Sequence, residues 1–390
     1  MEGIMDPVSG IGPRRRPLSR AGYVALFCCL VVSACSKAPP RPEPLDAASA
    51  AERAKRLVAE LLVVDTHIDY PERHKPNWDL ALGTAGNFDY PRAVAGGLDV
   101  AFLAAYVPPE DEDVGKAYWK ACKRIAIVED AIAAHPDILA LARSPDDAVS
   151  NRAAGKLSLV IAIENGAPLE GRLERIAEFQ ERGVSYITLS HSEDNHLCDS
   201  STDADELPRW GGLSPFGRDA VREMNRLGVM IDVAHVSDET FWQVLELSSA
   251  PVIVSHTGVR SLTPGFERNM SDEMLAAIGE NGGVAQIAFA SVFVNDAYRA
   301  SYAASEIARV ADVARAVDLA VKAAGIDHVG IGSDFDGAGY SLPRELSDVS
   351  MYANLVRELL LLGYGDGDIA KILGGNLLRV WSEVRTAAEG

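Results

Sequence analysis

The sequence predicts an α/β protein with a (β/α)8 barrel, and three observations support this fold class. Eight short apolar, strand-like runs follow one another, helical patterns lie between them, and acidic or histidine side chains stand where several runs end. A core of residues 51–390 has the length that one such barrel fills. The runs span residues 61–65, 98–106, 158–163, 184–190, 229–234, 251–255, 283–289 and 328–333.

Two of the segments between these runs carry complete helix signals. Ser214 can cap a helix that has Pro215 in its first turn and that Gly228 closes. Its apolar face is formed by Phe216, Ala220, Val221, Met224 and Leu227. A second helix is predicted from Ser271 to Gly282, with apolar Met274, Leu275 and Ile278.

The first 34 residues predict a lipoprotein signal peptide that is not part of the fold. Arginines at positions 14–16 and 20 precede an apolar stretch, residues 21–32, which is too short to span a bilayer as a mature helix. Small residues then lead into Cys35, as in a bacterial lipobox, where the cysteine is lipidated. An ordinary signal peptide cleaved near Ala34 is the alternative.

Residues 35–50 then form a Pro-rich tether. The expected location is the periplasmic face of a bacterial membrane, with the outer membrane favoured over the inner one. Without residues 1–34 the formal net charge changes from −19 to about −21, which argues against nucleic acid as a partner. Of the cysteines, Cys122 and Cys198 remain in the fold, and whether they pair cannot be read from the sequence.

Five runs end in His, Asp or Glu, side chains of the types that bind metals, and the last of them ends at Asp334. His67 and Asp69 are two residues apart, so on a strand they point the same way. Glu164, His235 and His256 follow other runs. One catalytic zinc usually takes three protein ligands, so five ligands fit a pair of ions that share a carboxylate. Hydrogen-bonded strand-end histidines are the alternative for any single site, but five sites together favour metal.

These residues also carry a family resemblance. The chain resembles the membrane (renal) dipeptidase family of the amidohydrolase superfamily, in the family's order from residue 65 to residue 337. The segments responsible are Asp65–Asp69, Ile163–Gly166, Leu189–His191, Gly212–Gly217, Ile231–Ser237, Val254–His256, Arg268–Asn269 and Gly332–Gly337.

The resemblance implies a role for each site residue. His67 and Asp69 would bind one zinc ion, His235 and His256 a second, and Glu164 would bridge them while a hydroxide between the ions attacks the peptide carbonyl. The remaining roles are proton transfer by Asp334, oxyanion stabilisation by His191 and binding of the substrate's terminal carboxylate by Arg268. Without the resemblance, Asp334 would be interpreted as a turn residue, His191 as a loop histidine beside His196 and Arg268 as a surface charge near a helix.

The implied substrate is a dipeptide with a free C-terminal carboxylate, with a D-residue tolerated at that position, and relatives often form homodimers. Departures from the family pattern fall in the cleft loops: Ile68, Asn165–Pro168 and the acidic segment 192–199. A related metal amidohydrolase acting on N-acyl amino acids or β-lactams remains an alternative, because it would keep every catalytic residue. A non-catalytic binding lipoprotein is disfavoured, since every ligand and the proton carrier are present.

Overall fold

The computed structural model describes residues 45–204, 207–339 and 341–389. The signal peptide, Cys35 and most of the tether that the sequence predicts lie outside the described residues. The first helix begins at Ala47, within the segment assigned to the tether, because the Asp46 side chain accepts hydrogen bonds from the backbone N–H groups of Ala48 and Ser49.

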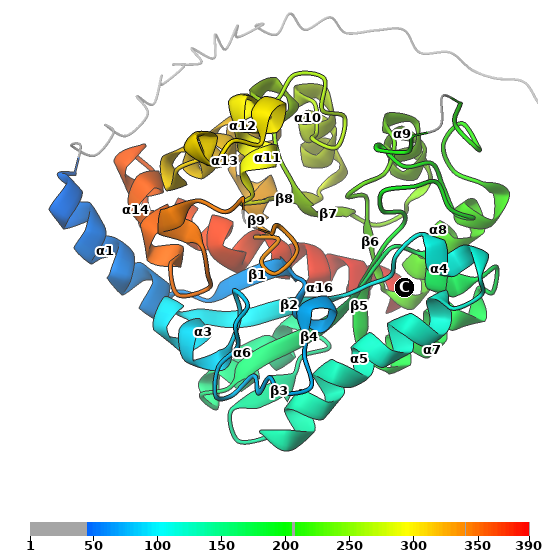
Figure 1. Ribbon diagram of the computed structural model, residues 1–390, viewed down its shortest axis with the longest axis horizontal. Helices are drawn as coiled ribbons and strands as arrows, with labels where there is room; N and C mark the ends of the chain where they lie inside the picture. The colour runs from blue at the N-terminus through cyan, green and yellow to red at the C-terminus, as the bar shows by residue number, and fades with distance from the viewer. Residues whose placement is uncertain (1–44, 205–206, 340, 390) are drawn as a thin grey trace, which may run out of the picture. The chain divides into compact units, whose positions relative to one another are not determined.

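Eight parallel strands form the barrel (Figure 1), which confirms the predicted fold class. The strands, in the order in which they pair, are β1 (Val63–Ile68), β2 (Leu98–Tyr106), β4 (Leu157–Glu164), β5 (Val184–Thr188), β6 (Met230–Asp232), β7 (Ile253–Thr257), β8 (Val284–Ile287) and β9 (Val329–Ile331). The ring closes just beyond β9, where the Asp334 N–H donates to the His67 carbonyl (3.1 Å) and the Asp69 N–H to the Phe335 carbonyl (2.8 Å).

One strand, β3 (Leu139–Leu141), has no counterpart among the predicted runs and pairs with the start of β4 outside the ring. The helices are α1 (Ala47–Glu60), α2 (Tyr70–Arg73), α3 (Tyr90–Gly96), α4 (Glu110–Asp113), α5 (Ala117–Ala134), α6 (Pro145–Ala153), α7 (Glu174–Glu181), α8 (Pro215–Leu227), α9 (Asp238–Leu247), α10 (Asp272–Asn281), α11 (Ser291–Val294), α12 (Asp296–Ser301), α13 (Val310–Ala324), α14 (Tyr352–Leu361), α15 (Asp366–Ala370) and α16 (Asn376–Glu389).

The two helices with complete sequence signals form as predicted. The Ser214 side chain accepts from the Gly217 N–H at the start of α8, and Gly228 ends that helix at φ 69°, a conformation that favours glycine. Ser271 caps α10 in the same way, and Gly282 ends it at φ 80°.

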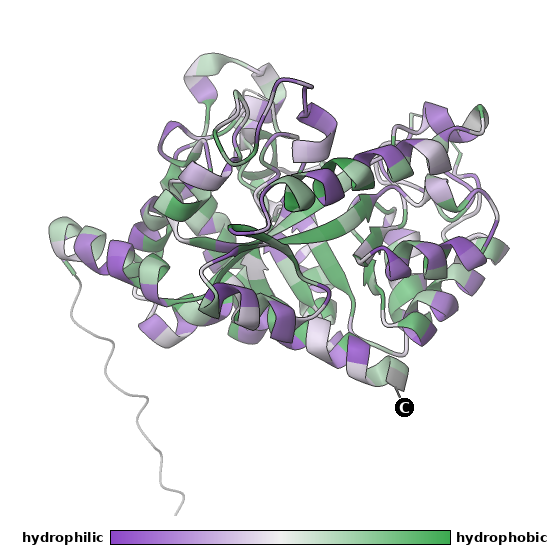
Figure 2. Ribbon diagram, turned by 90° about the horizontal axis from the view of Figure 1, so that it is seen from below, coloured by the Kyte–Doolittle hydropathy of each residue, from purple (hydrophilic) through white to green (hydrophobic). Residues whose placement is uncertain are grey.

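Side chains fill the interior of the barrel, and α16 closes it at the amino ends of the strands. Phe102 and Tyr186 stack there with ring centroids 5.8 Å apart, and Trp381 of α16 meets Phe102 at 5.4 Å. In Figure 2 the strands form an apolar centre, and the surrounding helices alternate apolar and polar residues. The amino end of the barrel is therefore packed, which leaves the carboxyl ends of the strands for a site.

The structure also bears on two questions that the sequence raises, one about membrane-spanning segments and one about the pairing of the cysteines. Within the described ranges, helices that combine the length and the apolar character needed to cross a bilayer are absent. Cys122 and Cys198 are free thiols in this structure, so they do not pair with each other.

Candidate metal centre

The five predicted metal ligands meet at the carboxyl ends of the strands. They are His67 in β1, Asp69 just after it, Glu164 at the end of β4, His235 after β6 and His256 in β7. Their ligand atoms form two groups that share Glu164, one with His67 and Asp69 and one with His235 and His256, and within each group all the atoms lie within 4.8 Å of one another. The strand order thus assembles one cluster from residues far apart in sequence.

Glu164 stands between the two groups. Its Oε2 is 3.5 Å from His67 Nε2, which in turn is 3.4 Å from Asp69 Oδ2. Its Oε1 is 3.1 Å from His235 Nε2 and 3.6 Å from His256 Nε2. One carboxylate therefore directs a separate oxygen at each group, as a carboxylate shared by two cations does.

Tyr186 orients the His67 imidazole. The Tyr186 hydroxyl donates to the Thr66 carbonyl (3.0 Å), so its oxygen accepts from His67 Nδ1 (2.8 Å). This network keeps a proton on Nδ1, so Nε2 is the ring nitrogen that a cation can bind. Among the described residues, the buried Nε2 has no hydrogen-bonding partner. A ring nitrogen that faces two carboxylates suits a site where a cation replaces its proton.

A second relay orients His256. The Ser255 hydroxyl donates to Asp232 Oδ2 (2.6 Å), so its oxygen accepts from His256 Nδ1 (3.0 Å). Asp232 also accepts from the backbone N–H of Ser255 (2.8 Å). The proton again lies on Nδ1, and Nε2 faces His235 and Glu164. Both relays place the imidazoles in the tautomer that binds metal.

Replacing Tyr186 by Phe tests the first relay. We expect Tyr186→Phe to lower metal affinity by about 10- to 100-fold, because His67 loses the acceptor that fixes its tautomer while the ring still fills the barrel. Competition with a chelator measures this affinity. Tyr364→Phe, which removes a hydroxyl that binds Asp318 on another side of the fold, should leave the affinity unchanged. Equal affinity in the two variants would contradict the relay.

The electrostatics differ between the two groups of ligands. Burial lowers the pKa of His67, but Tyr186, Glu164 and Asp69 raise it well above its usual range, so a cation that binds His67 displaces a proton. Burial and then Arg268 hold the pKa of His235 well below its usual range, and burial and then His67 do the same for the pKa of His256. Both imidazoles are therefore neutral, as metal ligands must be. Burial favours the neutral form of Glu164, but His67 and His191 hold its pKa well below the usual range. The shared carboxylate is thus ionised.

Asp334 and His191 face the same space. Asp334 follows β9, and burial and then Asp69 raise its pKa well above the ordinary value. His191 follows β5; its Nε2 is 3.7 Å from Glu164 Oε1, and its ring lies 4.2 Å from that of His235. The structure therefore brings both residues to the cluster, as the family resemblance implies.

Arg268 is not a surface charge. Its side chain is 5% exposed, and its Nη2 donates to the His256 carbonyl (3.0 Å). Its Nε and Nη1 have no hydrogen-bonding partners among the described residues. Burial lowers the pKa of Arg268 to about 10, so it stays charged at neutral pH. It does not line the cavity directly but lies 5.3 Å from the Phe293 ring, which does.

A cavity of about 350 Å³ opens above the cluster. It is lined by Asp69, Glu72, Arg73, Tyr106, Glu164, His191, His235, His256, Phe293, Asp334, Asp336 and Gly337. The sequence analysis did not single out four of these residues: Glu72, Arg73, Tyr106 and Phe293. Tyr106 ends a predicted strand, so the strand-end rule could have found it. The other three lie on the short helices α2 and α11, which no sequence pattern marked.

The backbone adopts unfavourable conformations around this cavity. His235 (φ 68°), Asp334 (φ 63°) and Asp336 (φ 68°) lie in the left-handed region, which residues other than glycine rarely occupy. All three line the cavity. Residues are held in such conformations where the surrounding structure fixes them, and they cluster at functional sites.

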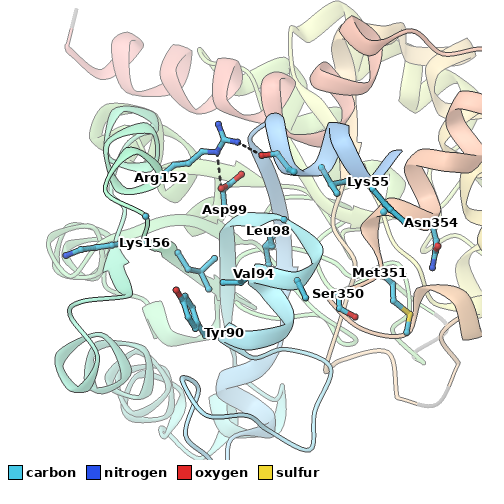
Figure 3. Close-up of a pocket in the computed structure, with 17 residues that line it drawn as sticks. Lys55, Tyr90, Val94, Leu98, Asp99, Arg152, Lys156, Ser350, Met351 and Asn354 are labelled. Atoms are coloured by element: carbon cyan, nitrogen blue, oxygen red, sulfur yellow. Dashed lines mark hydrogen bonds and ion pairs between the residues drawn. The ribbon is translucent and has the colours of Figure 1, made fainter. Parts of the chain in front are cut away.

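A second cavity, of about 640 Å³, lies elsewhere (Figure 3). Leu98 and Leu157, which begin β2 and β4, line it, so it lies at the amino ends of the strands. Several of its charged groups are already engaged: Arg152 donates to Asp99 (3.0 Å), as Figure 3 shows, and to carbonyls at the end of α1, and Lys156 donates to the Pro136 carbonyl (2.7 Å). Most of the predicted metal-binding and catalytic residues line the cavity of about 350 Å³ instead.

Comparisons with known proteins show which family this chain resembles over most of its length. A family model described as membrane dipeptidase, peptidase family M19, matches residues 51–390. Dipeptidase tcpJ of Claviceps purpurea is 33% identical over 324 residues, which cover 81% of this chain and 73% of the relative.

Two solved structures have the same fold. The probable dipeptidase PvdM of Pseudomonas aeruginosa superposes with a TM-score of 0.80 at 30% identity, covering 87% of this chain and 99% of that one. A metallopeptidase of Rhodobacter sphaeroides, liganded with a phosphinate mimic of the dipeptide L-Ala-D-Ala, gives a TM-score of 0.74 at 25% identity, covering 83% of this chain and 99% of that one.

Proposed function

The chain belongs to the membrane dipeptidase family, peptidase family M19, and we propose that this metallo-dipeptidase uses two zinc ions to hydrolyse dipeptides that have a free C-terminal carboxylate. The position of Glu164 carries the proposal, because its two oxygens face two separate groups of ligand atoms. Imidazole and carboxylate ligands suit zinc.

In this proposal His67 and Asp69 would hold one ion, His235 and His256 would hold the other, and Glu164 would be shared by both sites. Zinc ions at such a centre polarise a carbonyl group and lower the pKa of water toward neutrality. The second relay, through Ser255 and Asp232, keeps Nε2 of His256 free for its ion.

The other residues bind the peptide and move protons. Asp334 accepts a proton from the attacking water on its carboxylate and returns it to the leaving amine. His191 donates from Nε2 to the carbonyl oxygen as negative charge develops there. Arg268 binds the terminal carboxylate through Nε and Nη1, whose N–H groups have no other partner among the described residues.

We further propose that a D-residue is accepted at the C-terminal position. The Rhodobacter sphaeroides metallopeptidase, which shares this fold, is liganded with a mimic of L-Ala-D-Ala. Homodimer formation, which the family resemblance implies, stays a prediction.

A substrate panel combined with metal analysis tests the proposed function. The purified full chain should contain about two zinc ions and should cleave both L-Ala-L-Ala and L-Ala-D-Ala. Cleavage of N-acetyl amino acids or β-lactams, with no turnover of any dipeptide, would assign the chain to the related amidohydrolases instead. A stoichiometry of one ion would contradict the two-ion centre.

The lipid anchor is a separate proposal, and Cys35→Ser tests it. Without the cysteine no acyl chains can be attached, so we expect the protein to leave the membrane fraction for a soluble periplasmic or unprocessed form. Cell fractionation followed by immunoblotting measures the distribution. Cys122→Ser, which changes a cysteine within the fold, should stay with membranes. Unchanged membrane association of Cys35→Ser would refute lipidation at this residue.

A further inference from the structure

We propose that Asp336 binds the free α-ammonium group of the dipeptide's N-terminal residue, which makes it the residue that distinguishes a dipeptide from an N-acyl amino acid. The proposal rests on the proposed dipeptidase function and deepens it. It concerns a residue outside the proposed metal ligands and outside the residues proposed to transfer protons.

The first observation is a buried carboxylate oxygen without a partner. Asp336 is 4% exposed and lines the cavity, and its Oδ2 makes no hydrogen bond within the described residues. Burial raises its pKa to about 6, so the carboxylate is largely ionised at neutral pH. An unpaired buried charge is costly, so the site is suited to a cationic ligand.

The second observation is that this side chain is fixed in place. Asp336 Oδ1 accepts from the Asn87 N–H (2.7 Å), and the Asp336 N–H donates to Asn87 Oδ1 (2.9 Å). A Cβ on Gly86 would lie 2.3 Å from Asp336 Oδ1, so the glycine permits this close approach. The backbone of Asp336 is itself left-handed. These contacts use one carboxylate oxygen and leave the other for a ligand.

The other carboxylates of the cavity already have a role or a partner. Asp69 and Glu164 belong to the metal centre and Asp334 to proton transfer, while Glu72 forms an ion pair with Arg124. Arg73 and Arg92 are the cations that lower the pKa of Asp336. Within the described part of the chain neither forms an ion pair with it. Asp336 is thus the cavity carboxylate without an assigned cation.

The position of Asp336 fits the direction of a bound dipeptide. Arg268 contacts His256 on the β7 side of the cluster, whereas Asp336 follows β9 and is tied to the loop before α3. A dipeptide with its carboxylate at Arg268 and its scissile carbonyl at the metal centre beside His191 would extend toward Asp69 and Asp336. Its α-ammonium group is the end that reaches this carboxylate.

The matched pair L-Ala-D-Ala and propanoyl-D-Ala, which lacks only the α-amino group, tests the inference in the zinc-loaded full chain. Asp336→Asn keeps the acceptor for Asn87 and tolerates a positive φ, but loses the charge. We expect kcat/KM for L-Ala-D-Ala to fall by about 10- to 100-fold, chiefly through KM, and kcat/KM for propanoyl-D-Ala to stay within about twofold. Zinc content should not change.

Two further variants make the result decisive. Asp336→Gly, which suits φ 68° without strain, should show the same selective loss if Asp336→Asn folds poorly. Asp348→Asn, which alters a nearby carboxylate that binds Ser350 outside the cavity, should affect neither substrate. An equal loss on both substrates, or no loss on the dipeptide, would overturn the assignment. A wild-type protein that cleaves no dipeptide would instead refute the proposed function, and this inference with it.

Discussion

His256→Ala, like His235→Ala, should lower bound zinc from about two ions to about one per chain and remove most dipeptide turnover. Each imidazole supplies one of three ligand atoms in its group, and the other group keeps His67, Asp69 and Glu164. A site left with two protein ligands binds metal weakly. Metal analysis after gel filtration gives the stoichiometry, and turnover of L-Ala-D-Ala gives the activity.

A histidine outside the cluster provides the control. His135 ends α5 and pairs with Asp79, so His135→Ala should keep both ions and normal turnover. Full zinc content in both His235→Ala and His256→Ala would remove these residues from the ligand set. Loss of both ions from either variant would show that the two groups bind metal as one unit through Glu164, rather than as separable sites.

The barrel was predictable because its strands are apolar and its helices carry end signals. Each of the eight strands overlaps a predicted run, and β2 has the predicted bounds. β3 escaped prediction because three residues are too short to show a pattern. The reasoning for His67 and Asp69 was wrong in one respect: β1 ends at Ile68, so Asp69 lies off the strand. The pair still meets, because the Asp69 N–H bonds to the Phe335 carbonyl as the chain turns into α2.

The ligand candidates were predictable because metal-binding chemistry is confined to a few residue types. The groups that orient them were not. Tyr186 and His67 meet across the barrel interior, although they are 119 residues apart in sequence. A tyrosine in an apolar run gives no sign that its hydroxyl will reach a histidine. The same holds for Arg268, whose burial against His256 depends on how the loop after β7 folds back.

Asp334→Asn should reduce turnover by roughly a hundredfold or more while zinc stays near full occupancy, which separates proton transfer from metal binding. Asparagine has nearly the same size and tolerates the φ of 63° at this position, but its amide cannot accept a proton from water. The five proposed ligands are untouched. Binding of the substrate should survive, since Arg268 and Asp336 still meet its two ends.

The measurement that decides the role of Asp334 is zinc content alongside kcat. A carboxylate oxygen of Asp334 also lies within 4.8 Å of the ligand atoms of His67 and His256. Metal binding is therefore the alternative role that the experiment must separate from proton transfer. Loss of an ion from Asp334→Asn would show that the residue holds metal. Full zinc with near-normal kcat would show that Asp334 is structural. Its N–H group donates to the His67 carbonyl where the barrel closes, which is a structural role of this kind. Full zinc with a large fall in kcat and little change in KM is the result that only a proton carrier gives, because neither the metal centre nor the groups that bind the substrate have changed.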